Sequence, residues 1–128
     1  MQMRRNDSRD MRKRSGFTLL EVMVVVAILV VLAGGGVVLY LNYLEESKEK
    51  ITYTRIKAIE EAVQAYAVSH GYPESLQQLV DDRKVDADGL NDAWDQPLSY
   101  DPNGAMHNGT KPDIYSNHRR SDGSLISN

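Results

Sequence analysis

The stretch that decides the fold lies near the start of the chain and reads Arg12-Lys13-Arg14-Ser15-Gly16-Phe17-Thr18-Leu19-Leu20-Glu21. A basic segment ends at Gly16, an apolar segment begins at Phe17, and a single carboxylate follows at Glu21. Nineteen uncharged residues, 22–40, come next. A carboxylate in a membrane helix costs roughly 2.5–3.5 kcal/mol at the bilayer centre. Glu21 therefore requires a partner.

Charge is distributed unevenly along the 128 residues, although the formal net charge is only −3. Residues 1–16 hold six of the fifteen basic residues and two of the eighteen acidic ones, so residues 17–128 carry a formal charge near −7. Such a chain repels nucleic acid. Basic residues before an apolar segment stay in the cytoplasm, so the C-terminal part is expected on the other side of the membrane.

The apolar segment, residues 17–41, is long enough to cross a membrane. Its 25 residues exceed what a helix needs to span a hydrocarbon layer of about 30 Å. A secretory signal has a shorter apolar region followed by a cleavage site with small residues, and this segment instead continues into charged helix. By hydropathy alone, a plain single-pass anchor explains the segment equally well.

The junction Gly16-Phe17-Thr18-Leu19-Leu20-Glu21 resembles the class III leader and first helix of type IV pilins and of type II secretion pseudopilins. The resemblance implies cleavage between Gly16 and Phe17 and methylation of the new amino group of Phe17. It also implies that Glu21 pairs with that amino group on a neighbouring subunit. The implied divisions are a leader at 1–16, a transmembrane and assembly segment at 17–41 and a periplasmic domain at 42–128.

Periodicity predicts one helix from Phe17 to about His70, ended by Gly71 and Pro73, with an amphipathic second half. A short second helix is expected at 74–80.

Three consecutive glycines, Gly34, Gly35 and Gly36, lie inside the apolar half of the long helix. Each glycine costs nearly 1 kcal/mol of helix propensity relative to alanine. The triplet either permits close helix packing in the membrane or lets the segment unwind during assembly. Both interpretations stay open.

Short strands are expected at 98–100, 114–116 and 125–126, joined by turn dipeptides such as Asn103-Gly104. They form a small antiparallel sheet against the amphipathic half of the helix. The predicted fold class is therefore α+β and pilin-like.

The segment from Asp92 to Tyr100 is similar to a Trp-containing segment of major pseudopilins. Trp94, Pro97 and Tyr100 agree with that pattern and are expected to belong to the structural core. The resemblance also implies a calcium site in the loop after the closing strand, where this chain offers Asp122 beside two arginines. Calcium prefers six to eight oxygen ligands, so weak binding or none is expected. The three histidines have no metal-ligand spacing, and the chain has no cysteine.

These observations predict a structural subunit without catalytic residues or a required cofactor. The resemblance implies a type II secretion pseudopilus subunit in the inner membrane, with its N-terminus cytoplasmic and its domain periplasmic. Implied partners are further copies of itself, a prepilin peptidase, minor pseudopilins, and the inner-membrane assembly platform with its ATPase. The alternatives are a type IV pilus pilin, major or minor, and a membrane-tethered binding domain.

Overall fold

The computed structural model describes residues 16–128, so most of the predicted leader lies outside the described residues. Two helices, two short 3-10 helices and three strands follow in order: α1 (Leu19–His70), α2 (Gln77–Asp81), η1 (Ala87–Leu90), β1 (Ser99–Asp101), η2 (Ala105–His107), β2 (Asp113–Arg119) and β3 (Leu125–Ser127). This content confirms the predicted α+β class. The chain divides into two compact units between Leu39 and Tyr40, which are described separately.

The first unit consists of the apolar part of α1. Its side chains are exposed throughout, from Leu19 at 78% to Leu39 at 72%. Among residues 16–128, α1 is the one helix that is long and apolar enough to cross a membrane.

The glycine triplet is helical in the protomer. Gly34, Gly35 and Gly36 all belong to α1, so the helix is not unwound at this point. A Cβ added at Gly34, Gly35 or Gly36 would meet no atom of the protomer, so no contact within the chain requires glycine there. Close packing and unwinding both concern contacts between subunits, and both interpretations of the triplet stay predictions.

The second unit is built on the amphipathic part of α1. Four residues of this helix are buried, and they recur at spacings of four, three and four: Thr52, Ile56, Ile59 and Val63. This period places them on one face. The helix ends at His70, and Gly71 follows with a positive φ of 80°, the left-handed conformation that glycine adopts without a steric penalty. The predicted end of the helix is therefore confirmed.

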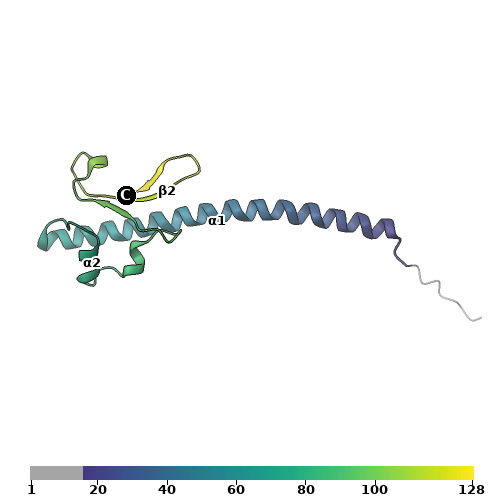
Figure 1. The fold of residues 1–128 in the computed structure, drawn as a ribbon, viewed down its shortest axis with the longest axis horizontal. Coiled ribbons are helices and arrows are strands. Elements are labelled where there is room, and N and C mark those ends of the chain that lie inside the picture. The colour runs from purple at the N-terminus through teal and green to yellow at the C-terminus, as the bar shows by residue number, and fades with distance from the viewer. Residues whose placement is uncertain (1–15) are drawn as a thin grey trace, which may run out of the picture. The chain divides into compact units, whose positions relative to one another are not determined.

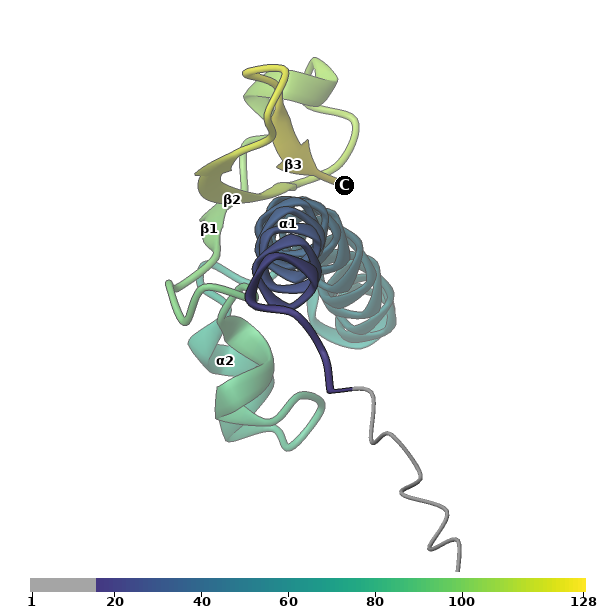
Figure 2. The same ribbon diagram turned by 90° about the vertical axis from the view of Figure 1, so that its right-hand side faces the viewer.

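The strands form an antiparallel sheet in the order β1-β2-β3. In the β1–β2 ladder Tyr100 lies opposite Ile114, and in the β2–β3 ladder Tyr115 lies opposite Ser127. Within the second unit, Figure 1 shows α2 and the sheet on different sides of α1. Figure 2, viewed nearly along the helix, shows that β1 is the strand of the sheet on the side of α2, between α2 and β2.

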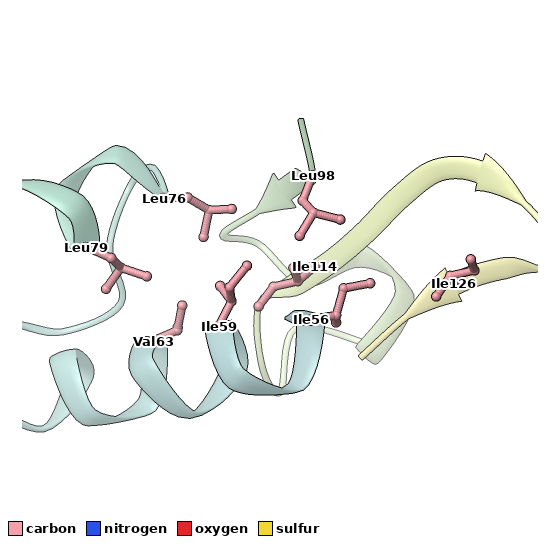
Figure 3. Close-up of a cluster of buried hydrophobic side chains, with 8 residues drawn as sticks. All are labelled: Ile56, Ile59, Val63, Leu76, Leu79, Leu98, Ile114 and Ile126. Atoms are coloured by element: carbon pink, nitrogen blue, oxygen red, sulfur yellow. The ribbon is translucent and has the colours of Figure 1, made fainter. Parts of the chain in front are cut away.

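The core lies where the amphipathic face of α1, α2 with its preceding turn, and the sheet meet. Figure 3 shows its eight buried apolar side chains converging from these three sources: Ile56, Ile59, Val63, Leu76, Leu79, Leu98, Ile114 and Ile126. Within the part of the chain that the structure describes, every buried side-chain nitrogen or oxygen has a hydrogen-bond partner. The small core is therefore combined with buried polar side chains that are all paired.

The second helix begins later than predicted. It covers Gln77–Asp81 rather than 74–80. The backbone N–H of Glu74 donates to the side-chain carbonyl of Gln78 at 3.1 Å, so residues 74–76 form a turn that leads into the helix. Leu76 and Leu79 of this segment are buried, whereas Val80 is half-buried.

Candidate functional site

The first candidate site is the start of α1, where Thr18 and Glu21 bind each other's backbone. The Thr18 N–H donates to Glu21 Oε2 at 3.2 Å, and the Glu21 N–H donates to Thr18 Oγ1 at 3.2 Å. The Thr18 carbonyl also accepts the N–H of Val22 at 3.2 Å, as the residue that caps a helix does. These reciprocal bonds form a capping box, which satisfies N–H groups that the first turn leaves without partners.

The capping box was readable from the sequence and was missed. Thr18 and Glu21 have the Thr-x-x-Glu spacing directly before an apolar run, which is the signature of this motif. The carboxylate of Glu21 therefore has a partner within its own protomer. Its pairing with another subunit stays a prediction, and Oε2 already accepts this local bond.

A shallow apolar groove lies beside Glu21. It has a volume of about 260 Å³ and is lined by Phe17, Glu21 and three valines, Val22, Val25 and Val26. Phe17 is 88% exposed. The structure thus brings Phe17 and Glu21 to one surface.

The second candidate site is the loop from Asn91 to Pro97, which is organised around the fully buried Asp92. Asp92 Oδ1 accepts the backbone N–H groups of Trp94 and Gln96, each at 2.9 Å. Asp92 Oδ2 accepts the hydroxyl of Ser116 on β2 at 2.7 Å. One carboxylate therefore closes the loop and fastens it to the sheet.

Two side chains of α1 hold the same loop from the other side. Arg55 Nη1 donates to the carbonyl oxygens of Asn91 and Asp92, both at 2.9 Å. The buried hydroxyl of Thr52 accepts the N–H of Ala93 at 3.0 Å. Hydrogen bonds to charged groups contribute roughly 1.5–3 kcal/mol each, so Arg55 and Asp92 are the main polar attachments of the loop.

Trp94 extends from this loop toward α1 and β2. It is half-buried and packs against the core cluster. Its ring stacks on His118 with centroids 3.7 Å apart, and Lys48 Nζ lies 5.9 Å from the centroid. His118 Nε2 lies 3.0 Å from Glu45 Oε1 on α1. These contacts join α1, the loop and the sheet near Glu45.

The other two residues expected in the core differ from each other. Tyr100 is half-buried against the core, and its hydroxyl donates to the carbonyl of Pro73 at 2.8 Å. Burial raises the pKa of Tyr100 to about 12. Pro97, in contrast, is exposed, and its expected place in the core was wrong. Pro97 bridges to Asn91 at the mouth of the loop, and the next residue, Leu98, takes the buried position.

A third polar cluster ties the sheet to α1 through Glu60. Its carboxylate receives Lys111 Nζ at 2.6 Å, Lys57 Nζ at 2.9 Å and the amide nitrogen of Asn128 at 3.2 Å. Burial by itself raises the pKa of Glu60, but the bonds from Lys111 and Lys57 outweigh it and lower the pKa to about 2. The carboxylate is therefore charged at neutral pH and serves as an acceptor shared by three segments.

In the turn between β2 and β3, the predicted calcium ligand Asp122 accepts a hydrogen bond from a neighbouring residue. Asp122 Oδ1 accepts the N–H of Ser124 at 2.8 Å. The side chain of Ser124 and then this backbone N–H lower the pKa of Asp122. Arg119 Nη1 donates to the carbonyl of Gly123 at 2.9 Å, which occupies a second oxygen of the loop. Within residues 16–128, no three His, Asp or Glu side chains are grouped to hold a metal ion. Weak calcium binding or none at Asp122 stays a prediction.

Comparison with known proteins gives one family motif and one similar protein. Residues 11–37 match the family model of the prokaryotic N-terminal methylation motif. The chain is 44% identical over 70 residues to the type II secretion system core protein G of Vibrio cholerae. The alignment covers 54% of this chain and 48% of that protein, so the chain spans about half the length of the curated relative it matches. No solved structure matches the chain. The chain therefore carries a prokaryotic N-terminal methylation motif, and its predicted resemblance to the type II secretion proteins is confirmed.

Proposed function

We propose that this protein is a structural subunit of a type II secretion pseudopilus that polymerises through the first part of α1 and catalyses no reaction. The observation that supports this proposal most strongly is the methylation motif over residues 11–37, joined to similarity with a type II secretion core protein. The apolar helix that follows fits a single-pass membrane protein. A prepilin peptidase would cut between Gly16 and Phe17 and leave a methylated amine on Phe17.

Assembly in this proposal exchanges one partner of Glu21 for another. In the protomer the Glu21 carboxylate accepts the N–H of Thr18. In the fibre it would pair with the amine of Phe17 on a neighbouring copy, whose helix would fill the apolar groove beside it. Opposite charges attract more strongly in a medium of low dielectric, so this pairing offsets desolvation when its geometry is good.

The remaining partners follow from the same proposal. The basic leader would stay in the cytoplasm, and residues 42–128 would fold in the periplasm. An assembly platform and a cytoplasmic ATPase would supply the work of lifting each apolar helix from the membrane into the fibre. Minor pseudopilins would complete the fibre. No cofactor is required for this mechanical role.

The structure suggests a pair of substitutions that separates charge pairing from helix capping. Glu21→Gln removes the charge. It keeps a side-chain oxygen that accepts the N–H of Thr18, because glutamine also serves in a capping box. Thr18→Ala removes the capping hydroxyl and keeps the charge. We expect Glu21→Gln to lose fibre formation while the chain still inserts in the membrane. Thr18→Ala should retain more assembly than Glu21→Gln, measured by intersubunit cross-linking and by recovery of sheared fibres.

Two alternatives predict different results. A membrane-tethered binding domain needs neither cleavage nor Glu21, so normal function of Glu21→Gln in an unassembled form would favour it. A type IV pilus pilin needs both, and it differs from the proposal in where the fibre appears. A fibre that extends from the cell surface at native expression, with secretion unaffected by deletion of the chain, would favour the pilus.

A further inference from the structure

Two tyrosines stand where the apolar part of α1 gives way to charged sequence. Tyr40 is 62% exposed and Tyr43 is 70% exposed. They are three residues apart in a helix, so their rings lie on neighbouring positions of its surface. On the basis of the proposed membrane span, we propose that Tyr40 and Tyr43 bind the phospholipid headgroup layer at the outer face of that membrane. They would fix how deeply α1 sits in the bilayer.

The spacing along α1 supports this depth. Glu21 and Tyr40 are nineteen residues apart, which corresponds to about 28 Å along a helix. The hydrocarbon layer is about 30 Å thick. When the carboxylate of Glu21 lies at the cytoplasmic face, the hydroxyl of Tyr40 reaches the opposite face. The first charged residue after Tyr40 is Glu45, five residues or about 7.5 Å farther along the helix.

The chemistry of the side chains favours lipid over water or protein. Tyrosine has an apolar ring and a polar hydroxyl, and it concentrates at both interfaces of a membrane for this reason. Two other tyrosines, Tyr66 and Tyr100, pack against the core of the second unit, whereas Tyr40 and Tyr43 receive no such cover. The uncovered pair begins directly after the aliphatic residues that end in Leu39. A second copy of the chain is the competing partner for this surface.

The absence of cysteine allows a direct measurement of depth on the full-length chain. Single substitutions Leu39→Cys, Asn42→Cys and Glu46→Cys would each carry a nitroxide in bilayers of three thicknesses. Relative exposure to oxygen and to a polar paramagnetic reagent then locates the hydrocarbon boundary along α1. We expect this boundary to stay between Leu39 and Glu46 at every thickness.

The same three labels are then measured in the double variant Tyr40→Ser/Tyr43→Ser. Without its interfacial side chains the helix should slide with bilayer thickness, and the boundary should move by about one turn, ~5 Å. The matched control is Tyr53→Ser/Tyr72→Ser, which alters two tyrosines that are 42% and 49% exposed elsewhere in the second unit. The control should behave as the unaltered chain does.

Three results would overturn the inference in distinguishable ways. A boundary that moves with thickness equally in both forms shows that apolar length alone sets the depth, and it leaves the membrane span intact. Access of the polar reagent to all three positions and to Val25→Cys contradicts the span and the proposed function with it. Unchanged depth together with lost intersubunit cross-linking in the double variant assigns the tyrosines to a second copy instead of lipid.

Discussion

The buried carboxylate of Asp92 offers the sharpest test of how the second unit holds together. Asp92→Ala leaves three donors without an acceptor: the N–H groups of Trp94 and Gln96 and the hydroxyl of Ser116. An unsatisfied buried polar group costs about 1–3 kcal/mol. We therefore expect Asp92→Ala to lower the free energy of unfolding by about 3 kcal/mol.

Asp92→Asn is a milder form of the same change. The amide oxygen of asparagine still accepts the two backbone N–H groups, but its NH2 group faces the hydroxyl of Ser116 and cannot accept from it. We expect a loss of about 1–2 kcal/mol. For a unit of this size each 1 kcal/mol lowers Tm by about 4–8 °C.

Unfolding of the full chain in detergent by heat and by urea would measure both variants. Circular dichroism follows the helix, and the fluorescence of Trp94 follows the loop itself because the chain has one tryptophan. Asp95→Asn is the matched control, since Asp95 is exposed and has a positive φ of 59° that asparagine tolerates well. A Tm for Asp92→Ala within the error of the control would refute the assigned role of this carboxylate.

Two further predictions concern Glu60 on α1 and two glycines in the loops of the sheet. The pKa of Glu60 is lowered to about 2 in the fold, so the stability that this carboxylate contributes is present above its ordinary pKa near 4.5 and is lost as the pH falls toward 2. Glu60→Gln should therefore flatten this part of the plot of unfolding free energy against pH. An unchanged slope would contradict the pairing of Glu60 with the two lysines. Gly104→Ala should destabilise the fold by more than Gly123→Ala. Both glycines have a positive φ, so the backbone strain is similar in the two variants. A Cβ at Gly104 would also lie 1.9 Å from the carbonyl oxygen of Lys111, whereas a Cβ at Gly123 would meet no atom. Equal Tm values for the two alanine variants would show that the η2 loop relaxes around the new side chain.

The architecture was predictable because its signals are strong and local. An apolar run directly before a helical period predicted a single helix, and Gly71 marked its end. The alternation of turn dipeptides with short apolar segments predicted the three strands, although β2 extends to Arg119, three residues beyond the predicted segment. Its added residues are polar, so period and hydropathy gave no sign of them, and pairing of Arg119 with Leu125 across the turn extends the strand.

The polar network of the second unit was less accessible to sequence reasoning. Asp92, Ser116 and Thr52 are buried because they satisfy one another and the loop backbone across segments that lie far apart in the chain. No local pattern reports such a long-range match. The exposed position of Pro97 was missed for the same reason, since which residue of a turn faces the core depends on the bridge that closes it. The capping box of Thr18 and Glu21, in contrast, is local and was available from spacing alone.

The most direct test of the central claim is the intact mass of the protein from membranes, with and without an active prepilin peptidase. We predict that the peptidase yields a species that lacks residues 1–16 and carries one methyl group on the amine of Phe17. Without the peptidase the full chain should remain. A chain that keeps residues 1–16 beside a peptidase that processes a known substrate in the same cells would contradict the proposed subunit and favour a plain membrane anchor.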